Sequence, residues 1–288
     1  AELIPADDGC KSLGEQFSGR FQGVALASLL LLFLPALAGL FWGAPLVARE
    51  VEHGTHRLVW TQGVSRLRWA VVKFGLVGAG VVAVATCYAL LLTWWRAPLD
   101  RVAAGTAVGN KFGFLLFDLE GLVPVGYALF AVALGVFAGV LTRRTQAAMA
   151  VTLVGYLATR LLVEFLARPR FLAPLRRTYP VIGDQELNAI GGDWVIRAGV
   201  YNAEGTRLAG GTFGNYSSSV CPPVTTVPDT PPTTNRCVLQ YGEGAYNLQL
   251  FHPADRYWLF QGIETALFVA LAVLLLLAAV HWVRRRIS

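Results

Sequence analysis

The residues of this chain that could carry chemistry do not form a complete catalytic or metal-binding set. His53 and His56 are not spaced as in the His-Glu-x-x-His pattern of zinc enzymes, and no third ligand lies near them. His252 and Asp255 could assist a nucleophilic serine, but the sequence has no Gly-x-Ser-x-Gly turn. It also has no Gly-x-x-x-x-Gly-Lys-Ser/Thr loop to cradle phosphates. We therefore expect no metal site, no cofactor and no catalytic residue in this chain.

Three ionisable residues lie inside long apolar runs, where a charge is costly and usually faces the protein interior. Arg160 and Glu164 are four residues apart and share a helix face, so they could form a structural pair or line an outer gate. We favour the structural pair. Glu264 has no local partner, which favours a role in the gate, although it could pair with Arg256. Asp118 and Glu120 are expected to be solvated.

Long apolar runs determine the fold class that we predict. Of the 288 residues, 55% are hydrophobic and 15% are charged, against about 25% charged in a typical soluble domain. A helix needs roughly 20 apolar residues to cross a bilayer. Five runs reach that length: 24–47, 70–95, 122–141, 147–167 and 259–283. We predict an all-α, multi-pass protein of the plasma membrane with five visible spans, and no nucleic-acid partner.

Basic residues indicate the orientation, because Lys and Arg are retained on the cytoplasmic side of a membrane. The link between spans one and two, the turn at Arg143 and Arg144, and the Arg284–Arg286 tail fall on one side by parity. We predict that this side, with the C-terminus, is cytoplasmic. Four arginines after span four lie on the outer side, where a long translocated region weakens the rule. An outer aromatic belt is then expected at Trp94, Trp95, Tyr257 and Trp258.

The remaining segments define the domain organisation. Residues 1–20 form an extracellular segment, and residues 21–167 hold spans one to four with a cytoplasmic loop at 48–69. Residues 168–258 form a small β-containing extracellular cap, and residues 259–288 form the last span and tail. Within the cap, two strands are predicted at 194–200 and 206–213, around a turn at 202–205.

Cys221 and Cys237 are both predicted to be extracellular, on either side of a proline-rich loop. The oxidising exterior permits a disulfide between them. Such a bridge would stabilise the cap by roughly 3 kcal/mol in the chain-entropy model. We expect this disulfide; the alternative is two free thiols in a flexible loop.

The loop at 48–69 is patterned more strongly than a simple turn. Gly54 can end the helix that carries Glu50, Thr55 can cap a short second helix, and Ser65 can cap span two. The short helix would present Trp60 and its apolar neighbours within a polar rim, which suits a groove on a partner protein. A turn lying on lipid headgroups fits the pattern equally well.

The same loop resembles the first intracellular loop of ABC-2-type transporter permeases, and it is most similar to those of high-GC Gram-positive bacteria. The matching residues are Arg49-Glu50, Gly54-Thr55, Trp60-Thr61-Gln62, Ser65-Arg66 and Lys73. Further matches open span three at Val123–Tyr127, bridge to span four at Arg143–Thr145, and open span five at Pro253–Arg256. The resemblance covers most of residues 21–168 and 252–286.

This resemblance implies the transmembrane subunit of an exporter. Two permease subunits, identical or different, would form a dimer in the lipid bilayer, and separate ATPase subunits would bind ATP and Mg²⁺. Family members usually have six spans, so a sixth is expected before Ala1. The alternative is a membrane sensor or scaffold whose 168–258 region binds an external ligand. Carried over by position, the residues that face the ATPase are Glu50, Thr55, Arg57, Trp60, Ser65 and Arg66.

Overall fold

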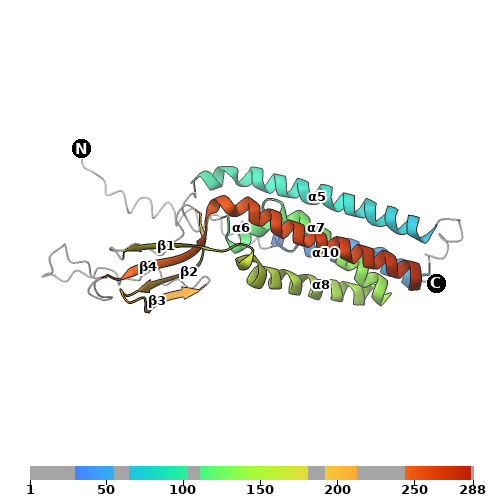
Figure 1. Cartoon of the computed structure of the whole chain (residues 1–288). Helices are drawn as coiled ribbons and strands as arrows, with labels where there is room; N and C mark the ends of the chain where they lie inside the picture. The colour runs from blue at the N-terminus through green and yellow to red at the C-terminus, as the bar shows by residue number, and fades with distance from the viewer. Residues whose placement is uncertain (1–29, 55–64, 103–110, 181–191, 213–243, 287–288) are drawn as a thin grey trace. The chain divides into compact units, whose positions relative to one another are not determined.

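A computed structural model describes residues 30–54, 65–102, 111–180, 192–212 and 244–286 (Figure 1). The chain divides into two compact units. The first, here named the helical unit, comprises Ala1–Leu92, Asp118–Thr159 and Glu264–Ser288. The second, here named the sheet unit, comprises Thr93–Phe117 and Arg160–Ile263.

Within the described residues, four helices are long and apolar enough to cross a membrane. They are α5 (Arg66–Val102), α7 (Val123–Thr142), α8 (Thr145–Leu162) and α10 (Tyr257–Arg286). A π-helical turn η3 (Val163–Ala167) and a 3-10 turn η4 (Arg168–Arg170) extend α8, and a 3-10 turn η5 (Ala254–Arg256) precedes α10. These elements confirm a polytopic membrane protein and correspond to four of the five predicted spans.

The first predicted span has a different construction. It consists of α2 (Leu34–Ala38), a π-helical turn η1 (Gly39–Gly43) and α3 (Ala44–Glu52). Pro35 and Pro45 stand in the first turns of α2 and α3, which is where proline is most common in a helix. The junction residues Ala38 and Ala44 keep right-handed helical angles. The run is therefore helical from Leu34 to Glu52, but in three short elements.

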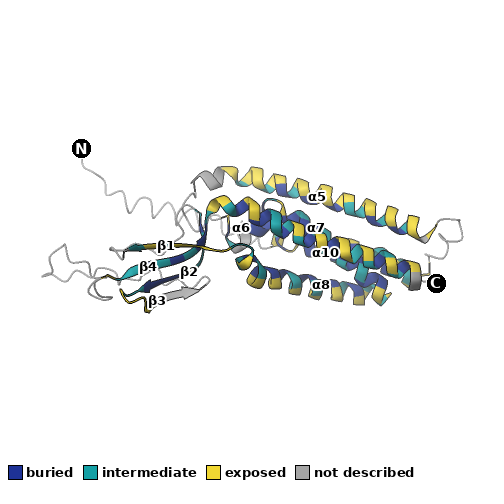
Figure 2. Ribbon diagram, viewed as in Figure 1, coloured by how far each residue is buried: buried dark blue, intermediate teal, exposed yellow. Residues whose placement is uncertain are grey.

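Helix α7 is the most buried span of the helical unit (Figure 2). In the most apolar 18-residue stretch of α7, 67% of the residues are buried, whereas 17% are buried in the corresponding stretch of α5. Glycines allow α7 to approach the first helix closely: a Cβ atom at Gly135 would lie 2.5 Å from the carbonyl oxygen of Gly39. Close backbone approach through small residues is typical of membrane helices. Helix α7 therefore packs tightly against the α2–α3 segment.

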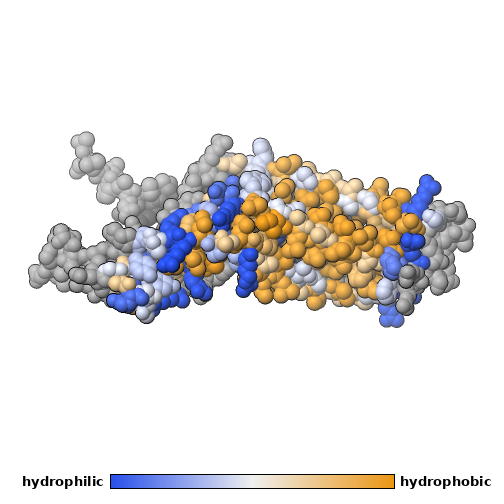
Figure 3. Space-filling view, in the orientation of Figure 1, coloured by the Kyte–Doolittle hydropathy of each residue, from blue (hydrophilic) through white to orange (hydrophobic). Residues whose placement is uncertain are grey.

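Helix α5, by contrast, exposes large apolar side chains along its length, among them Leu76 and Leu90. In the space-filling view, hydrophobic side chains cover the helices, and hydrophilic ones gather where α10 ends (Figure 3). Because lipid tails are as apolar as leucine, this surface is suited to the hydrocarbon of a bilayer.

The sheet unit contains an antiparallel sheet whose described strands are β1 (Leu175–Pro180), β2 (Trp194–Tyr201), β3 (Arg207–Thr212) and β4 (Tyr246–His252). Their order is β1-β4-β2-β3. Strands β2 and β3 confirm the predicted hairpin, whose turn is closed by Asn202 Oδ1 accepting a hydrogen bond from the Thr206 N–H at 2.6 Å. Strands β1 and β4 were not predicted, because β4 pairs with two segments distant in the sequence.

Candidate functional site: the coupling segment and the buried polar clusters

Residues 48–69, here named the coupling segment after the role that the family resemblance implies for them, begin in α3 and end in α5. Helix α3 stops at Glu52, and Gly54 adopts a φ of +71°, as a glycine does after a helix. The segment is described again from Ser65, whose Oγ accepts a hydrogen bond from the Arg68 N–H at 3.3 Å. Both predicted boundaries are thereby confirmed, and Arg66 is the first residue of α5. Thr55, Arg57 and Trp60 lie outside the described residues.

Glu50, a predicted ATPase-docking residue, forms an ion pair with Lys73 of α5. Both side chains are partly buried, at 33% and 20% exposure, so solvent screens the pair less than an exposed one. The Lys73 ammonium also lies 4.9 Å from the ring centre of Trp69. Glu50 therefore connects the two helices that flank the coupling segment.

Glu52 connects α3 to α8. Its Oε2 accepts hydrogen bonds from the backbone N–H of Thr145 at 3.0 Å and from the Thr145 hydroxyl at 2.8 Å. Thr145 is the first residue of α8, where a carboxylate satisfies a free N–H and complements the helix dipole. These two bonds, the backbone one foremost, lower the pKa of Glu52 below its usual value. Sequence reasoning missed this contact, because its partners are 93 residues apart.

A buried polar cluster joins α7 to α10 within the helical unit. The Tyr127 hydroxyl lies 2.9 Å from Asp118 Oδ1 and is also hydrogen-bonded to Glu264 Oε1. The exposed fractions of Tyr127, Asp118 and Glu264 are 1%, 3% and 0%. Asp118 and Glu120 were expected to be solvated, and that prediction is wrong: Glu120 is 4% exposed. The short helix α6 (Phe114–Leu119) and the turn after it place both carboxylates in the interior.

In the Tyr127 cluster, one hydroxyl group lies within hydrogen-bond distance of two carboxyl groups. A phenol has one hydrogen to donate, so it cannot donate to Asp118 and Glu264 at once. The ring is held in place by Phe268 of α10, with centroids 4.7 Å apart, and by Tyr156 of α8 at 6.4 Å. Two carboxyl groups thus share one well-positioned hydroxyl in apolar surroundings. Glu264 and its partner Tyr127 are 137 positions apart in the sequence, so no local pattern could reveal this hydrogen bond.

Arg160 and Glu164, the other predicted gate residues, belong to the sheet unit and are buried at 6% and 4% exposure. Glu164 Oε1 lies 3.9 Å from Nη1 of Arg168, an ion-pair partner that sequence reasoning missed. The Arg168 guanidinium lies 4.2 Å from the ring centre of Phe117. Glu164 and Arg168 lie in η3 and η4, four residues apart, a spacing that places two side chains on one face of a helix.

Aromatic rings form the core of the sheet unit around Phe112. This ring stacks on Trp194 at 5.7 Å and meets the edge of Tyr257 at 5.8 Å. Tyr257 is 6% exposed, so its predicted place in an aromatic belt is wrong. Its neighbour Trp258 is 61% exposed, as a belt residue would be.

The cysteine prediction concerns residues that the structure does not describe. Cys221 and Cys237 lie outside the described ranges, so the disulfide stays a prediction. Cys87 of α5 is a free, exposed thiol.

A family model described as "ABC-2 membrane transporter related" matches residues 2–168, more than half of the 288-residue chain. The match includes the coupling segment and Tyr127. No curated protein and no solved structure gives a significant match. The chain therefore belongs to the ABC-2 membrane transporter related family and is a multi-pass membrane protein of the permease type.

Proposed function

We propose that this chain is the transmembrane permease subunit of an ABC-2-type exporter, driven by a separate ATPase subunit that binds ATP and Mg²⁺. Two permease subunits, identical or different, would enclose the transport path in the plasma membrane. The observation that carries this proposal is that two contacts at the start of the coupling segment, Glu50–Lys73 and Glu52–Thr145, join α3 to α5 and α8.

These attachments suit the transmission of force. The Glu50–Lys73 ion pair links α3, which precedes the segment, to α5, which follows it. The hydrogen bond between Glu52 and Thr145 links α3 to α8. Helix α3 also packs closely on α7, where a Cβ atom at Gly139 would lie 2.7 Å from the Ala44 carbonyl oxygen. A displacement of the segment by an ATPase would therefore move packed helices together, as coupling between distant sites requires.

The outer gate is proposed to involve Glu264. Glu264 is held by Tyr127 across α7 and α10, and a buried contact of this kind has discrete made and broken arrangements. Substrate would pass outward when such contacts open. With the basic side cytoplasmic, the coupling segment and the C-terminus would both face the cell interior.

Co-purification tests the ATPase partner. The affinity-tagged full chain is isolated from native membranes, and the recovered ATPase subunit is quantified. We expect a double variant, Arg57→Ala with Trp60→Ala, to recover at least about tenfold less ATPase, because anchor residues dominate such interfaces. The matched control is Arg284→Ala with Trp94→Ala, which changes the same residue types at exposed positions outside the segment. Equal recovery by both double variants would remove the docking role.

Vesicle assays distinguish an exporter from the alternative sensor or scaffold. The complex is reconstituted, and accumulation of candidate substrates is measured with and without ATP. ATP-dependent accumulation supports the exporter. A complex that binds an external ligand through residues 168–258 but shows no ATP-dependent flux would favour the sensor.

A further inference from the structure

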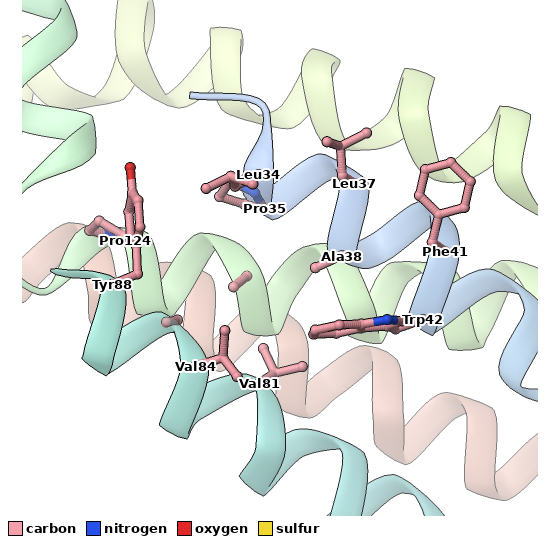
Figure 4. A pocket seen from close by; sticks show the side chains of 12 residues that line it. Leu34, Pro35, Leu37, Ala38, Phe41, Trp42, Val81, Val84, Tyr88 and Pro124 are labelled. Atoms are coloured by element: carbon pink, nitrogen blue, oxygen red, sulfur yellow. The ribbon is translucent and has the colours of Figure 1, made fainter. Parts of the chain in front are cut away.

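Two cavities of the helical unit lie between the first helical run and α5, and Figure 4 shows the one that Tyr88 lines. Their volumes are about 320 and 460 Å³. Both are lined by Phe41 and Trp42 of η1 and by Val81 and Val84 of α5, and they therefore adjoin one another. We name the two adjoining cavities together the α2–α5 groove.

The first part of the α2–α5 groove is apolar. Of the twelve side chains that line it, only those of Trp42 and Tyr88 contain polar atoms. Figure 4 shows Trp42 extending from the first helical run toward Val81 of α5. Phe41 is 60% and Val84 56% exposed, so the groove opens sideways. In a bilayer, this opening admits a hydrocarbon chain.

The second part ends at a positive charge. The groove is lined by Pro35 at one end and by Arg49 at the other. These residues are fourteen positions apart on a helical path, or about 20 Å. One leaflet contributes about half of the ~30 Å hydrocarbon core, so an acyl chain fits this length. Within the described ranges, the exposed Arg49 side chain has no carboxylate partner.

We infer that the α2–α5 groove binds one anionic phospholipid, with an acyl chain along Phe41, Trp42 and Val84 and its phosphate at Arg49. The acyl chain of the lipid exchanges one apolar environment for another, so it contributes little to the selectivity of binding. The headgroup contributes the selectivity, because a guanidinium forms charge-assisted, often bidentate hydrogen bonds with phosphate. This binding is additional to the proposed export function and needs no ATPase.

Native mass spectrometry of the purified full chain tests the headgroup. The chain is incubated with phosphatidylglycerol or phosphatidylcholine carrying identical acyl chains. We expect phosphatidylglycerol to be retained about five- to tenfold more, from the contribution of one arginine near a membrane surface. Arg49→Gln should abolish this preference, whereas Arg284→Gln, at an exposed arginine in the last turn of α10, should keep it. An equal loss in both variants would overturn the proposal.

A second pair of variants tests the acyl chain. Val84→Trp fills the groove and should abolish retention of both lipids. Val72→Trp makes the same change at a 60% exposed position of α5 that does not line the groove, and should retain them. Unchanged retention by Val84→Trp would overturn the proposal. The proposal would also be overturned if Val84→Trp separated two copies of the protein without any loss of lipid, because the groove would then be a contact between subunits.

Tyr88→Phe tests the direction of the lipid, because Tyr88 lines the end of the groove away from Arg49. We expect unchanged retention of phosphatidylglycerol. Loss of retention in Tyr88→Phe, with none in Arg49→Gln, would place the headgroup at the wrong end and overturn the proposal. Lipid mass is read without ATPase or transport, so failure of the ATPase-docking experiment would leave this result unaffected.

Discussion

The coupling segment and the Tyr127 cluster both join helices through carboxylates, but they do so in different surroundings. Glu52 is exposed and Glu50 is partly buried, whereas Asp118 and Glu264 are almost entirely buried. Water can replace a hydrogen bond that is lost at an exposed carboxylate. It cannot readily do so in the interior, where an unmet polar group carries its full desolvation penalty. The exposed contacts can therefore adjust gradually, whereas the buried cluster favours discrete states.

Removal of the Tyr127 hydroxyl should have the largest effect. Tyr127→Phe keeps the ring against Phe268 and removes the group that both carboxyls contact, so we expect a loss of about 1–3 kcal/mol in unfolding free energy. The measurement is chemical unfolding in detergent. Tyr88→Phe is the matched control, because the buried Tyr88 hydroxyl has no hydrogen-bond partner among the described residues. It should change stability by less than about 0.5 kcal/mol. Similar losses in both variants would erase the contrast between the two regions.

An intermediate effect is expected at Glu50. Glu50→Gln removes the charge that pairs with the partly buried Lys73, and we expect a loss of about 0.5–1 kcal/mol after solvent screening. Because the pair is partly screened, the loss should shrink as salt concentration rises. Unfolding at low and high salt measures both, with Glu204→Gln in the exposed β2–β3 turn as the control. A loss larger than that of Tyr127→Phe would reverse the proposed order.

The smallest loss of stability is expected for Glu52→Gln, and it can be recognised by its dependence on pH. The native pKa of this carboxyl is lowered by its bonds to Thr145, so the ionised form is the one that stabilises the fold. That contribution is present above the usual value of 4.5 and is lost as pH falls below 4.5 through the lowered native pKa. We expect Glu52→Gln to melt slightly below the unaltered chain at neutral pH, and the difference to close in acid. A difference that widened in acid would contradict this assignment.

Local sequence patterns predicted much of the fold. Four apolar runs became α5, α7, α8 and α10, because a bilayer requires long helices whose backbone bonds are satisfied internally. Gly54 and Ser65 mark the ends of their helices, and residues 202–205 form the predicted turn, because caps and turns depend on a few adjacent residues. The first run was predicted as one span, yet it contains a π-helical turn where Gly39 and Gly43 meet α7.

Contacts between distant residues could not be predicted from such patterns. The burial of Asp118, the Tyr127–Glu264 bond and the Glu52–Thr145 anchor each depend on which helix faces come together. The same is true of β4, which lies between β1 and β2, and of the groove that ends at Arg49. Hydrophobicity and helix-capping rules act over a few residues, so the sequence determined the membrane-spanning elements and their ends. Side-chain packing acts over the whole chain, and only the tertiary structure decided which polar groups meet in the interior.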